Sequence, residues 1–355
     1  MTFISGATNS TALSILQNMN AAKGTASNPT ANAAISILGP LETTSKASKQ
    51  AAEKVVAILN EQGGTIDLSR YGSAKASVTA GDHATITTGD GIASIYAQNF
   101  ATIYTGNNND EISTYANATV HAGGGNDVVQ AYSHATVDAG DGDDWVYVYD
   151  HSVVDGGAGN DVIRTYDYST VDGGDGDDFV VTLGNSAING GAGNDTLVVS
   201  SRRSADDSTF DNAVVDGGEG DDYIQVNGNS TVTGGTGNDT IRLIGDGNTV
   251  IFNKGDGHDT IGVGRGYANA KDSATINIKG YSADDVTVNR DADKVTVSFK
   301  GSDDAITVQV KYNASAKLAF EDGSTIDVTP AKFATLKSMD ASADALFGDI
   351  KPILA

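Results

Sequence analysis

One pattern of nine residues recurs along the middle of the chain at intervals of 17. Five copies align without gaps, and two more follow after an interruption of about ten residues. The copies begin at Ala122, Ala139, Gly156, Gly173, Gly190, Gly217 and Gly234, and a weaker one begins at Lys254. A fixed period of this kind is typical of solenoids, in which each repeat buries its apolar side chains against the repeats on either side.

Regularly spaced apolar residues divide each period in two. They are separated alternately by nine and eight residues: Ile86, Ile95, Ile103, Ile112, Val120, Val129, Val137, Val146, Val154, Ile163, Val171, Val180, Ile188 and Leu197. One half of a period is a turn rich in Gly and Asp followed by a short strand, and the other half is a turn without the glycine pair, also followed by a strand. The sequence therefore predicts a mainly β fold, a parallel β-roll or β-helix solenoid with two strands in each 17-residue coil.

The sequences on either side of the repeats differ from them. Residues 1–70 are predicted to form a helical cap, because Ser45 to Asn60 combines good helix formers with an apolar stripe. The solenoid is expected over residues 71–265. Residues 266–330 alternate apolar and polar positions, which favours an antiparallel β domain, and residues 331–355 are predicted to form an amphipathic tail.

Negative charge is concentrated in the repeats. The chain has 46 acidic and 22 basic residues, and between residues 80 and 260 the acidic residues number 29 against 5 basic ones. Phosphate is repelled by such a surface, which argues against a nucleic-acid partner. The absence of Cys excludes disulfides and thiolate metal sites, and no apolar run is long enough to span a membrane.

The acidic residues of this region are almost all aspartates, 27 Asp against 2 Glu. Short carboxylates beside glycine suit the coordination of a hard cation by oxygen in a tight turn. Stacked coils place equivalent aspartates about 5 Å apart, where repulsion is of order 1 kcal/mol in water and about 3 kcal/mol at an effective dielectric constant of 20. A divalent cation between successive turns would turn this repulsion into attraction, so we expect several Ca²⁺ ions and folding that depends on them.

The nine-residue pattern reads G-G-x-G-x-D-x-U-x, where U is apolar, and over about half of the chain it resembles the calcium-binding nonapeptide of the RTX (repeats-in-toxin) family. The pattern departs from that family because it alternates with an eight-residue half that lacks it, so we expect calcium along one edge only. The resemblance implies metal between same-edge turns of adjacent coils, held by the sixth-position Asp and turn carbonyls. The fifth position offers a further side-chain oxygen.

The predicted metal-site residues are the turn glycines and the fifth- and sixth-position residues of the repeats. They are Gly123, Gly125, Asn126, Asp127, Gly140, Gly142, Asp143, Asp144, Gly156, Gly157, Gly159, Asn160, Asp161, Gly173, Gly174, Gly176, Asp177, Asp178, Gly190, Gly191, Gly193, Asn194, Asp195, Gly217, Gly218, Gly220, Asp221, Asp222, Gly234, Gly235, Gly237, Asn238, Asp239 and Asp259. Upstream, Asn108 replaces the second turn glycine and Ala93 replaces the Asp, so those coils are expected to be poor in metal.

The opposite edge carries two files of residues with the same 17-residue spacing. One contains Tyr115, Tyr132, Tyr149 and Tyr166, and the other contains Asn117, His134, His151, Tyr168 and Asn185. A Tyr/His groove acting on polysaccharide, as in β-helical lyases and epimerases, is one interpretation. Stacking of like residues in equivalent environments is the favoured one, because an active site breaks translational symmetry. A file of threonines, interrupted by Val153, leaves ice binding as a weaker alternative.

No HExxH or GxSxG motif is present, and the chain is predicted not to be an enzyme. No N-terminal signal peptide is evident, and the RTX resemblance implies type I export directed by residues 331–355. We expect a secreted protein, extracellular or at the cell surface, that folds on external calcium and serves as a structural, surface-layer, matrix or adhesion component. Its expected partners are calcium, further copies of itself, and cell-surface or extracellular polysaccharide. The role of the 198–214 insertion stays open between a surface loop and a docking element.

Overall fold

The computed structural model describes residues 34–38, 55–60, 63–200, 212–264, 272–291, 294–311 and 313–329. Strands and two short 3-10 turns, η1 (Ser69–Tyr71) and η2 (Ala283–Asp285), make up the regular structure of these residues. None of their helices is long and apolar enough to cross a membrane. The chain divides into two compact units, residues 1–158 and 159–355, and each unit is described by itself.

The described residues of the first unit form thirteen strands. They are β1 (Ala34–Leu38), β2 (Val55–Asn60), β3 (Gly64–Asp67), β4 (Lys75–Ala80), β5 (Ala84–Thr87), β6 (Ala93–Ala97), β7 (Thr102–Tyr104), β8 (Glu111–Thr114), β9 (Thr119–His121), β10 (Val128–Ala131), β11 (Thr136–Asp141), β12 (Trp145–Val148) and β13 (Val153–Ala158). Within this unit the strands form two sheets, with the orders β1-β2-β4-β6-β8-β10-β12 and β3-β5-β7-β9-β11-β13.

Seventeen strands lie in the part of the second unit that the structure describes. They are β14 (Val162–Arg164), β15 (Thr170–Asp175), β16 (Phe179–Leu183), β17 (Ala187–Ala192), β18 (Thr196–Ser200), β19 (Val214–Glu219), β20 (Tyr223–Asn227), β21 (Thr231–Thr236), β22 (Thr240–Ile244), β23 (Asn248–Phe252), β24 (His258–Val263), β25 (Ser273–Ile278), β26 (Val286–Asp291), β27 (Lys294–Phe299), β28 (Ala305–Val310), β29 (Ser315–Phe320) and β30 (Thr325–Asp327). Its two sheets have the orders β14-β16-β18-β20-β22-β24-β28-β27-β26 and β15-β17-β19-β21-β23-β25-β29-β30.

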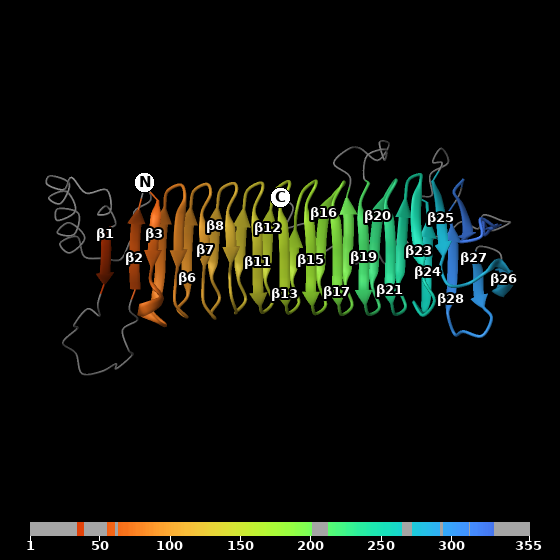
Figure 1. The fold of residues 1–355 in the computed structure, drawn as a ribbon, viewed down its shortest axis with the longest axis horizontal. Helices are drawn as coiled ribbons and strands as arrows, with labels where there is room; N and C mark the ends of the chain where they lie inside the picture. Colours follow the sequence, from red (N-terminus) through yellow and green to blue (C-terminus); the bar gives the residue numbers. More distant parts are fainter. Residues whose placement is uncertain are drawn as a thin grey trace. The chain divides into compact units, whose positions relative to one another are not determined.

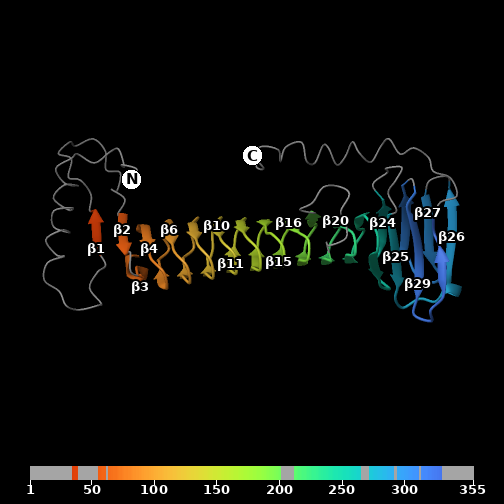
Figure 2. The same ribbon diagram turned by 90° about the horizontal axis from the view of Figure 1, so that it is seen from above.

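From β2 to β25 successive strands alternate between the two sheets, and within each unit these strands pair in parallel with the strand one coil away (Figure 1). Val129, for example, lies opposite Ile112 on one side and Val146 on the other, both exactly one 17-residue period away in the sequence. Figure 2 shows the strands of each unit in two layers. The predicted parallel β-solenoid with 17-residue coils is confirmed.

The core lies between the two layers. All fourteen apolar residues that divide the periods are buried, with no more than 4% of their surface exposed. Neighbouring residues along each strand point outward, as in β12, where the even positions Val146 and Val148 are buried and Trp145 is exposed. Each coil therefore contributes few apolar side chains of its own, and the core forms by stacking of coils.

The predicted helical cap is wrong where the structure describes it. Val55–Asn60 is strand β2, which pairs in parallel with β4, and the side chains of Ile58 and Asn60 are buried. A helix here would leave the polar backbone groups along this edge of β4 without strand partners, and β-branched Val55, Val56 and Ile58 are well suited to the strand. Residues 1–33, 39–54 and 61–62 lie outside the described part of the chain.

The predicted C-terminal antiparallel strands are confirmed. β26 pairs with β27, β27 with β28, and β29 with β30, all antiparallel. The same region also continues the solenoid, because β28 pairs in parallel with β24 and β29 pairs in parallel with β25. The proposed tail (331–355) and residues 201–211 of the insertion lie outside the described residues.

Candidate metal site

The sixth-position aspartates lie in a buried column on the Gly/Asp edge of each unit, at or just before the start of a strand. In the first unit the Asp column contains Asp110, Asp127 and Asp144; in the second it contains Asp161, Asp178, Asp195, Asp222, Asp239 and Asp259. Only 1–3% of each residue's surface is exposed. Aspartates are rarely buried to this degree unless they are paired or bind a metal.

Oδ1 of each Asp-column residue in the first unit, and of each one after Asp161 in the second, accepts a hydrogen bond from the preceding coil. Oδ1 of Asp127 accepts the backbone N–H of Asp110 at 2.7 Å. The same contact links Asp195 to Asp178 at 2.8 Å and Asp222 to Asp195 at 2.8 Å. The bond holds each side chain against the preceding coil and leaves its second oxygen for another interaction.

The second oxygens are buried without a hydrogen-bond partner at several positions, namely Asp110, Asp127, Asp178, Asp195, Asp222 and Asp239. In the second unit each of these Oδ2 atoms lies beside the first glycine of its own repeat. A Cβ atom on Gly190 would be 2.3 Å from Asp195 Oδ2 and 2.3 Å from the carbonyl oxygen of Gly217, one coil further on. A carboxylate oxygen and a backbone carbonyl of the next coil therefore converge on the same small space.

The same arrangement recurs at neighbouring coils of the second unit. Cβ atoms on Gly173 and Gly217 would lie 2.4 Å and 2.2 Å from the Oδ2 atoms of Asp178 and Asp222. The copies that begin at Ala122 and Ala139 have alanine at this position, and both alanines are completely buried. The tight contact with a first-position glycine is thus seen in the copies that begin at Gly173, Gly190 and Gly217.

Burial raises the pKa values of the Asp column. It raises the pKa of Asp127 and of Asp259 to about 8, of Asp178 and Asp222 to about 7, and of Asp195 and Asp239 to about 6. The loss of hydration is the largest cause, repulsion by neighbouring carboxylates adds to it, and the backbone hydrogen bonds oppose it. When no cation is bound, ionisation of the Asp-column carboxyls at neutral pH therefore destabilises the folded state.

The turn conformation that forms this edge requires glycine at the fourth position. Gly193 has φ +134°, and a Cβ atom there would be 2.1 Å from the carbonyl oxygen of Gly176 in the preceding coil. The backbones of adjacent turns thus approach too closely for any side chain.

The fifth-position residues form a separate, exposed ladder. Oδ1 of Asp177 accepts the backbone N–H of Asn194 at 2.7 Å, and Oδ1 of Asn194 accepts that of Asp221 at 2.8 Å. These bonds run to the following coil, whereas those of the Asp column run to the preceding one. The structure therefore brings the sixth-position carboxylates together with turn carbonyls, and it already engages the fifth-position Oδ1 atoms in a ladder of their own.

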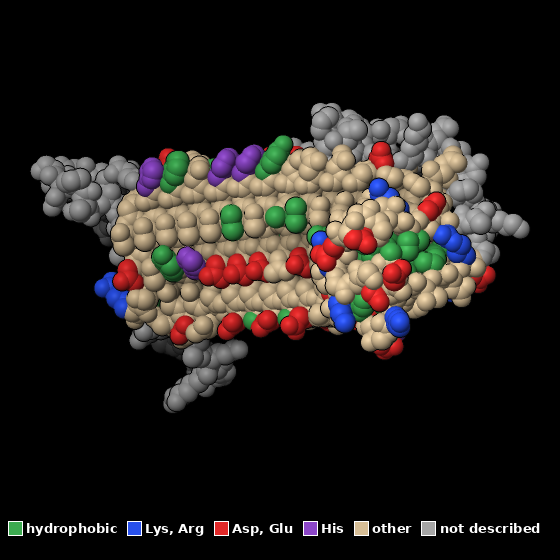
Figure 3. Space-filling model, turned by 45° about the vertical axis from the view of Figure 1, so that its right-hand side comes forward, with side chains coloured by type: hydrophobic (Ala, Val, Ile, Leu, Met, Phe, Trp, Pro, Cys, Tyr) green, Lys and Arg blue, Asp and Glu red, His purple; other side chains and the backbone are tan. Residues whose placement is uncertain are grey.

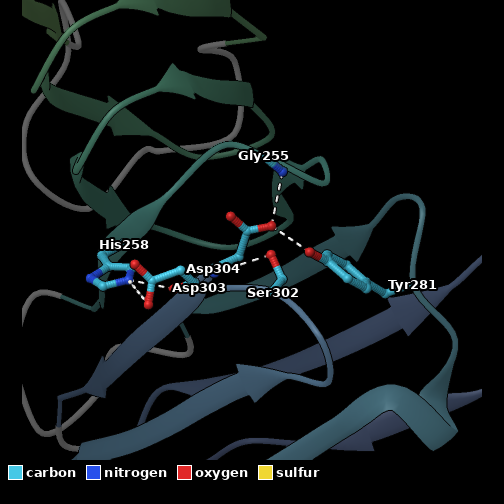
Figure 4. A network of polar contacts seen from close by, with 6 residues as sticks. All are labelled: Gly255, His258, Tyr281, Ser302, Asp303 and Asp304. Carbon is cyan, nitrogen blue, oxygen red and sulfur yellow. Dashed lines mark hydrogen bonds and ion pairs between the residues drawn. The ribbon is translucent and has the colours of Figure 1, made fainter.

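Further buried carboxylates lie where the Asp column ends. Asp256 and Asp304 are only 5–6% exposed. Asp304 accepts hydrogen bonds from the Gly255 N–H at 2.8 Å and from the Tyr281 hydroxyl (Figure 4). Burial acts to raise the pKa of Asp304, but these hydrogen bonds and one from Ser302 outweigh it, so the pKa lies below its ordinary value. Asp304 is therefore a satisfied anion that attaches the β27–β28 loop to the last repeat.

The opposite edge, called here the second edge, shows the stacking that the sequence predicted. The rings of Tyr115 and Tyr132 stack with centroids 5.1 Å apart, and those of His134 and His151 also stack at 5.1 Å. The His134 file has a left-handed backbone, with φ values of 58–62°: His83, Phe100, Asn117, His134, His151, Tyr168 and Asn185. The 17-residue spacing of the file did not reveal this conformation.

A row of acidic residues faces outward on the sheet that contains β11 and β13. Asp138 and Asp155 are neighbours in this row, and in the second unit Asp172 and Asp216 occupy equivalent positions. Figure 3 shows rows of acidic side chains on this face. Oδ2 of Asp138 lies 3.0 Å from Nδ1 of His121, whose ring stacks on Tyr104.

The sequence missed two members of the acidic edge. Asp110 belongs to an upstream coil that is expected to be poor in metal and is not among the predicted site residues, although it is buried and its Oδ2 has no hydrogen-bond partner. Asp256 occupies the third position of the weak copy at Lys254, where the copies from Ala139 to Gly234 carry exposed or half-exposed residues. The 17-residue spacing could have identified Asp110. The burial of Asp256 depends on the C-terminal strands, so the spacing does not reveal it.

The donor set fits a hard cation. It offers one buried carboxylate oxygen per coil next to a backbone carbonyl, and oxygen is the ligand that calcium prefers. Among the described residues, no group of three or more His, Cys, Asp or Glu side chains is placed to hold a metal ion. A cation on this edge would thus depend on backbone carbonyls as well as on the carboxylates. No protein-family model matches the chain, and no curated protein resembles it in sequence.

Proposed function

We propose that this protein is a calcium-binding solenoid of the RTX type, secreted from the cell, which folds on external Ca²⁺ and acts as a structural, surface-layer, matrix or adhesion component. The observation that carries the proposal is the Asp column, with its buried Oδ2 atoms beside turn carbonyls. A hard cation satisfies these oxygens and removes the repulsion between them.

The residues that would hold calcium are the sixth-position aspartates and the turns around them. When calcium is bound, it supplies positive charge that compensates the negative charge of the Asp column. The protein's own contribution is to position each carboxylate: Oδ1 is held by a backbone N–H, as in the Asp195–Asp178 contact, and Oδ2 is left facing the turn of the next coil. The fourth-position glycines let the turns approach closely enough for this.

Folding that depends on calcium suits export. A chain with 24 excess negative charges, most of them in the repeats, is self-repelling where calcium is scarce and folds where it is plentiful. The proposed partners outside the cell are further copies of the protein and extracellular or cell-surface polysaccharide.

The first test is calcium titration of the chelator-treated protein at pH 7.5, followed by circular dichroism. We expect little β signal in chelator and its return with calcium, and we expect magnesium at equal concentration to be far less effective because it demands a more rigid octahedral site. At pH 5.5, where the metal-free protein is expected to be folded with these carboxyls protonated, calcium binding in a weakly buffered solution should release protons, because carboxyls whose pKa in the folded state is about 7–8 ionise when metal binds. An unchanged β spectrum in chelator at pH 7.5 would contradict the proposal.

A further inference from the structure

The second edge of the first unit carries a column of tyrosines that the calcium proposal does not use. Tyr115, Tyr132 and Tyr149 occupy equivalent positions in three successive coils. Their ring centroids are 5.1 Å and 4.9 Å apart, and the ring planes differ by 9° and 5°. Two more tyrosines meet this tyrosine column edge-on, Tyr96 against Tyr115 at 6.0 Å and Tyr147 against Tyr149 at 5.3 Å.

The tyrosine column is open to solvent. Tyr115 is 38% exposed and Tyr132 is 41% exposed, so a reagent in solution reaches these rings. The chain has no Cys and only one Trp, and its three Met residues (Met1, Met19 and Met339) lie outside the described residues. The clustered tyrosines are therefore among the few easily oxidised groups in the described part of this unit.

We propose that the tyrosine column is a site of oxidative dityrosine formation, in which neighbouring rings of the same chain couple when a peroxide-driven one-electron oxidant acts on the protein. The bond links adjacent coils covalently, Tyr115 to Tyr132 or Tyr132 to Tyr149. This inference uses none of the proposed calcium ligands, because it rests on ring geometry at the opposite edge, and it requires only that the protein is folded.

The coupling balances with one molecule of hydrogen peroxide. Each of the two tyrosines gives up one electron and its phenolic proton and becomes a phenoxyl radical. The two radicals form a Cε–Cε bond, and the hydrogen on each bonded carbon then moves to the oxygen, which restores both aromatic rings. The two electrons and two protons removed reduce the peroxide to two molecules of water, and the protein loses two hydrogens in total.

The stacked geometry favours coupling between neighbours. The parallel coils hold the two ring axes side by side, and the rings are already within 5.1 Å. The χ2 torsion of tyrosine is soft, and rotation of both exposed rings about their Cβ–Cγ bonds points one Cε carbon at the other. Radicals formed on one ring thus have a fixed partner, whereas an isolated tyrosine must meet another molecule.

The test treats the folded full-length protein with hydrogen peroxide and a haem peroxidase at low protein concentration, followed by dityrosine fluorescence, gel electrophoresis and mass spectrometry. Cleavage before Asp places the three tyrosines in separate peptides, residues 110–126, 127–137 and 144–149. We expect cross-links between 110–126 and 127–137 and between 127–137 and 144–149, each two hydrogens lighter than the sum of its peptides, in protein that still migrates as a monomer.

Tyr132→Phe should lose both cross-links, because Tyr132 is the central ring. Tyr104→Phe is the matched control, since Tyr104 is 43% exposed but stacks on His121 instead of on a tyrosine; it should retain both. In strong denaturant the preference for cross-links between the stacked tyrosines should disappear. Cross-links found only between chains, or equally frequent among unstacked tyrosines of the folded protein, would overturn the proposal, as would unaltered cross-linking in Tyr132→Phe.

Discussion

The two oxygens of each sixth-position aspartate have different environments, and a single substitution can separate them. In Asp178→Asn the side-chain oxygen can still accept the backbone N–H of Asp161, as Asp178 Oδ1 does at 2.8 Å, while the buried second oxygen becomes an uncharged amide. Without calcium at pH 5.5 we expect the variant to be more stable than the wild type by about 1 kcal/mol, because the wild-type carboxyl, whose pKa is about 7 in the folded state against 3.8 ordinarily, must take up a proton on folding at this pH and the amide need not. With calcium at pH 7.5 we expect it to be less stable by about 2–3 kcal/mol, since it binds the ion less well.

Urea denaturation under the two conditions measures both effects. The matched control is Asp177→Asn, at the exposed neighbouring position where Asn already occurs in other repeats, as at Asn160 and Asn194. It should change stability little in either condition. The same sign of effect for Asp178→Asn with and without calcium would argue against a metal at this carboxylate.

Close approach of adjacent turns makes the fourth-position glycines irreplaceable. In Gly193→Ala the new methyl group would lie 2.1 Å from a backbone oxygen, on a residue with φ +134°. We expect destabilisation by about 3 kcal/mol or more, measured by thermal unfolding in calcium. Gly124→Ala is the control: its Cβ would meet no atom closer than 3.4 Å, and alanine occupies this third position at Ala158 and Ala192. Equal destabilisation by the two substitutions would show that close approach of the turns does not exclude a side chain at the fourth position.

At the scale of the structural element, the Asp column should make the metal-free protein sensitive to pH. The carboxyls have pKa values of about 6–8 in the folded state against 3.8 ordinarily. A raised pKa means that the folded state binds protons more tightly than the unfolded chain, so stability is greatest below about pH 4 and falls as pH rises toward 8. In chelator we therefore expect the β signal to persist in acid and to disappear as pH rises through this window.

Calcium should abolish most of this dependence, because it replaces the protons. Circular dichroism between pH 4 and pH 8, with chelator and with calcium, measures both curves. Identical curves under the two conditions would mean that the column does not exchange protons for metal.

The left-handed residues of the second edge give another prediction at this scale. His134 has φ +62°, a conformation that Asn tolerates and β-branched residues do not. We expect His134→Val to destabilise the protein by about 1–2 kcal/mol. His134→Asn should stay within about 0.5 kcal/mol of the wild type, since Asn117 and Asn185 adopt the same conformation. Chemical denaturation in calcium compares them, and a well-tolerated valine would show that the turn relaxes.

The predictability of these elements differs for physical reasons. The buried apolar residues and the parallel register follow from a strict period, because equivalent residues of a solenoid stack. The strand at Val55–Asn60 does not follow from its sequence, since its short apolar run is compatible with helix or strand and pairing with β4 decides. The stacking of the sixth-position aspartates follows from their spacing, but their burial, the unpartnered Oδ2 atoms and the left-handed turns depend on backbone geometry that residue types do not encode.

At the scale of the whole molecule, the ends of the sheets decide solubility. In the second unit β28 and β29 pair with the last solenoid strands, and the antiparallel strands β26, β27 and β30 then terminate the two sheets. Parallel strands β24 and β25 would otherwise present unpaired backbone groups to other molecules. We expect a chain ending at Ile278 to aggregate in calcium, as measured by light scattering. A monodisperse, folded truncation would show that the last strands are dispensable.

The hydrogen bonds of the Gly/Asp edge run in both directions, backward through the sixth position and forward through the fifth. Each coil thus makes the same kind of hydrogen bonds to the coil before it and to the coil after it, so the coils can stack in any order. The chain tolerates extra residues between strands without loss of order: β17 and β19 pair in parallel although their partners Ile188 and Val215 are 27 residues apart, and Asp195 still bonds to Asp222. Gene duplication or deletion of a complete coil would therefore lengthen or shorten the protein in uniform steps, leaving both ends unaltered.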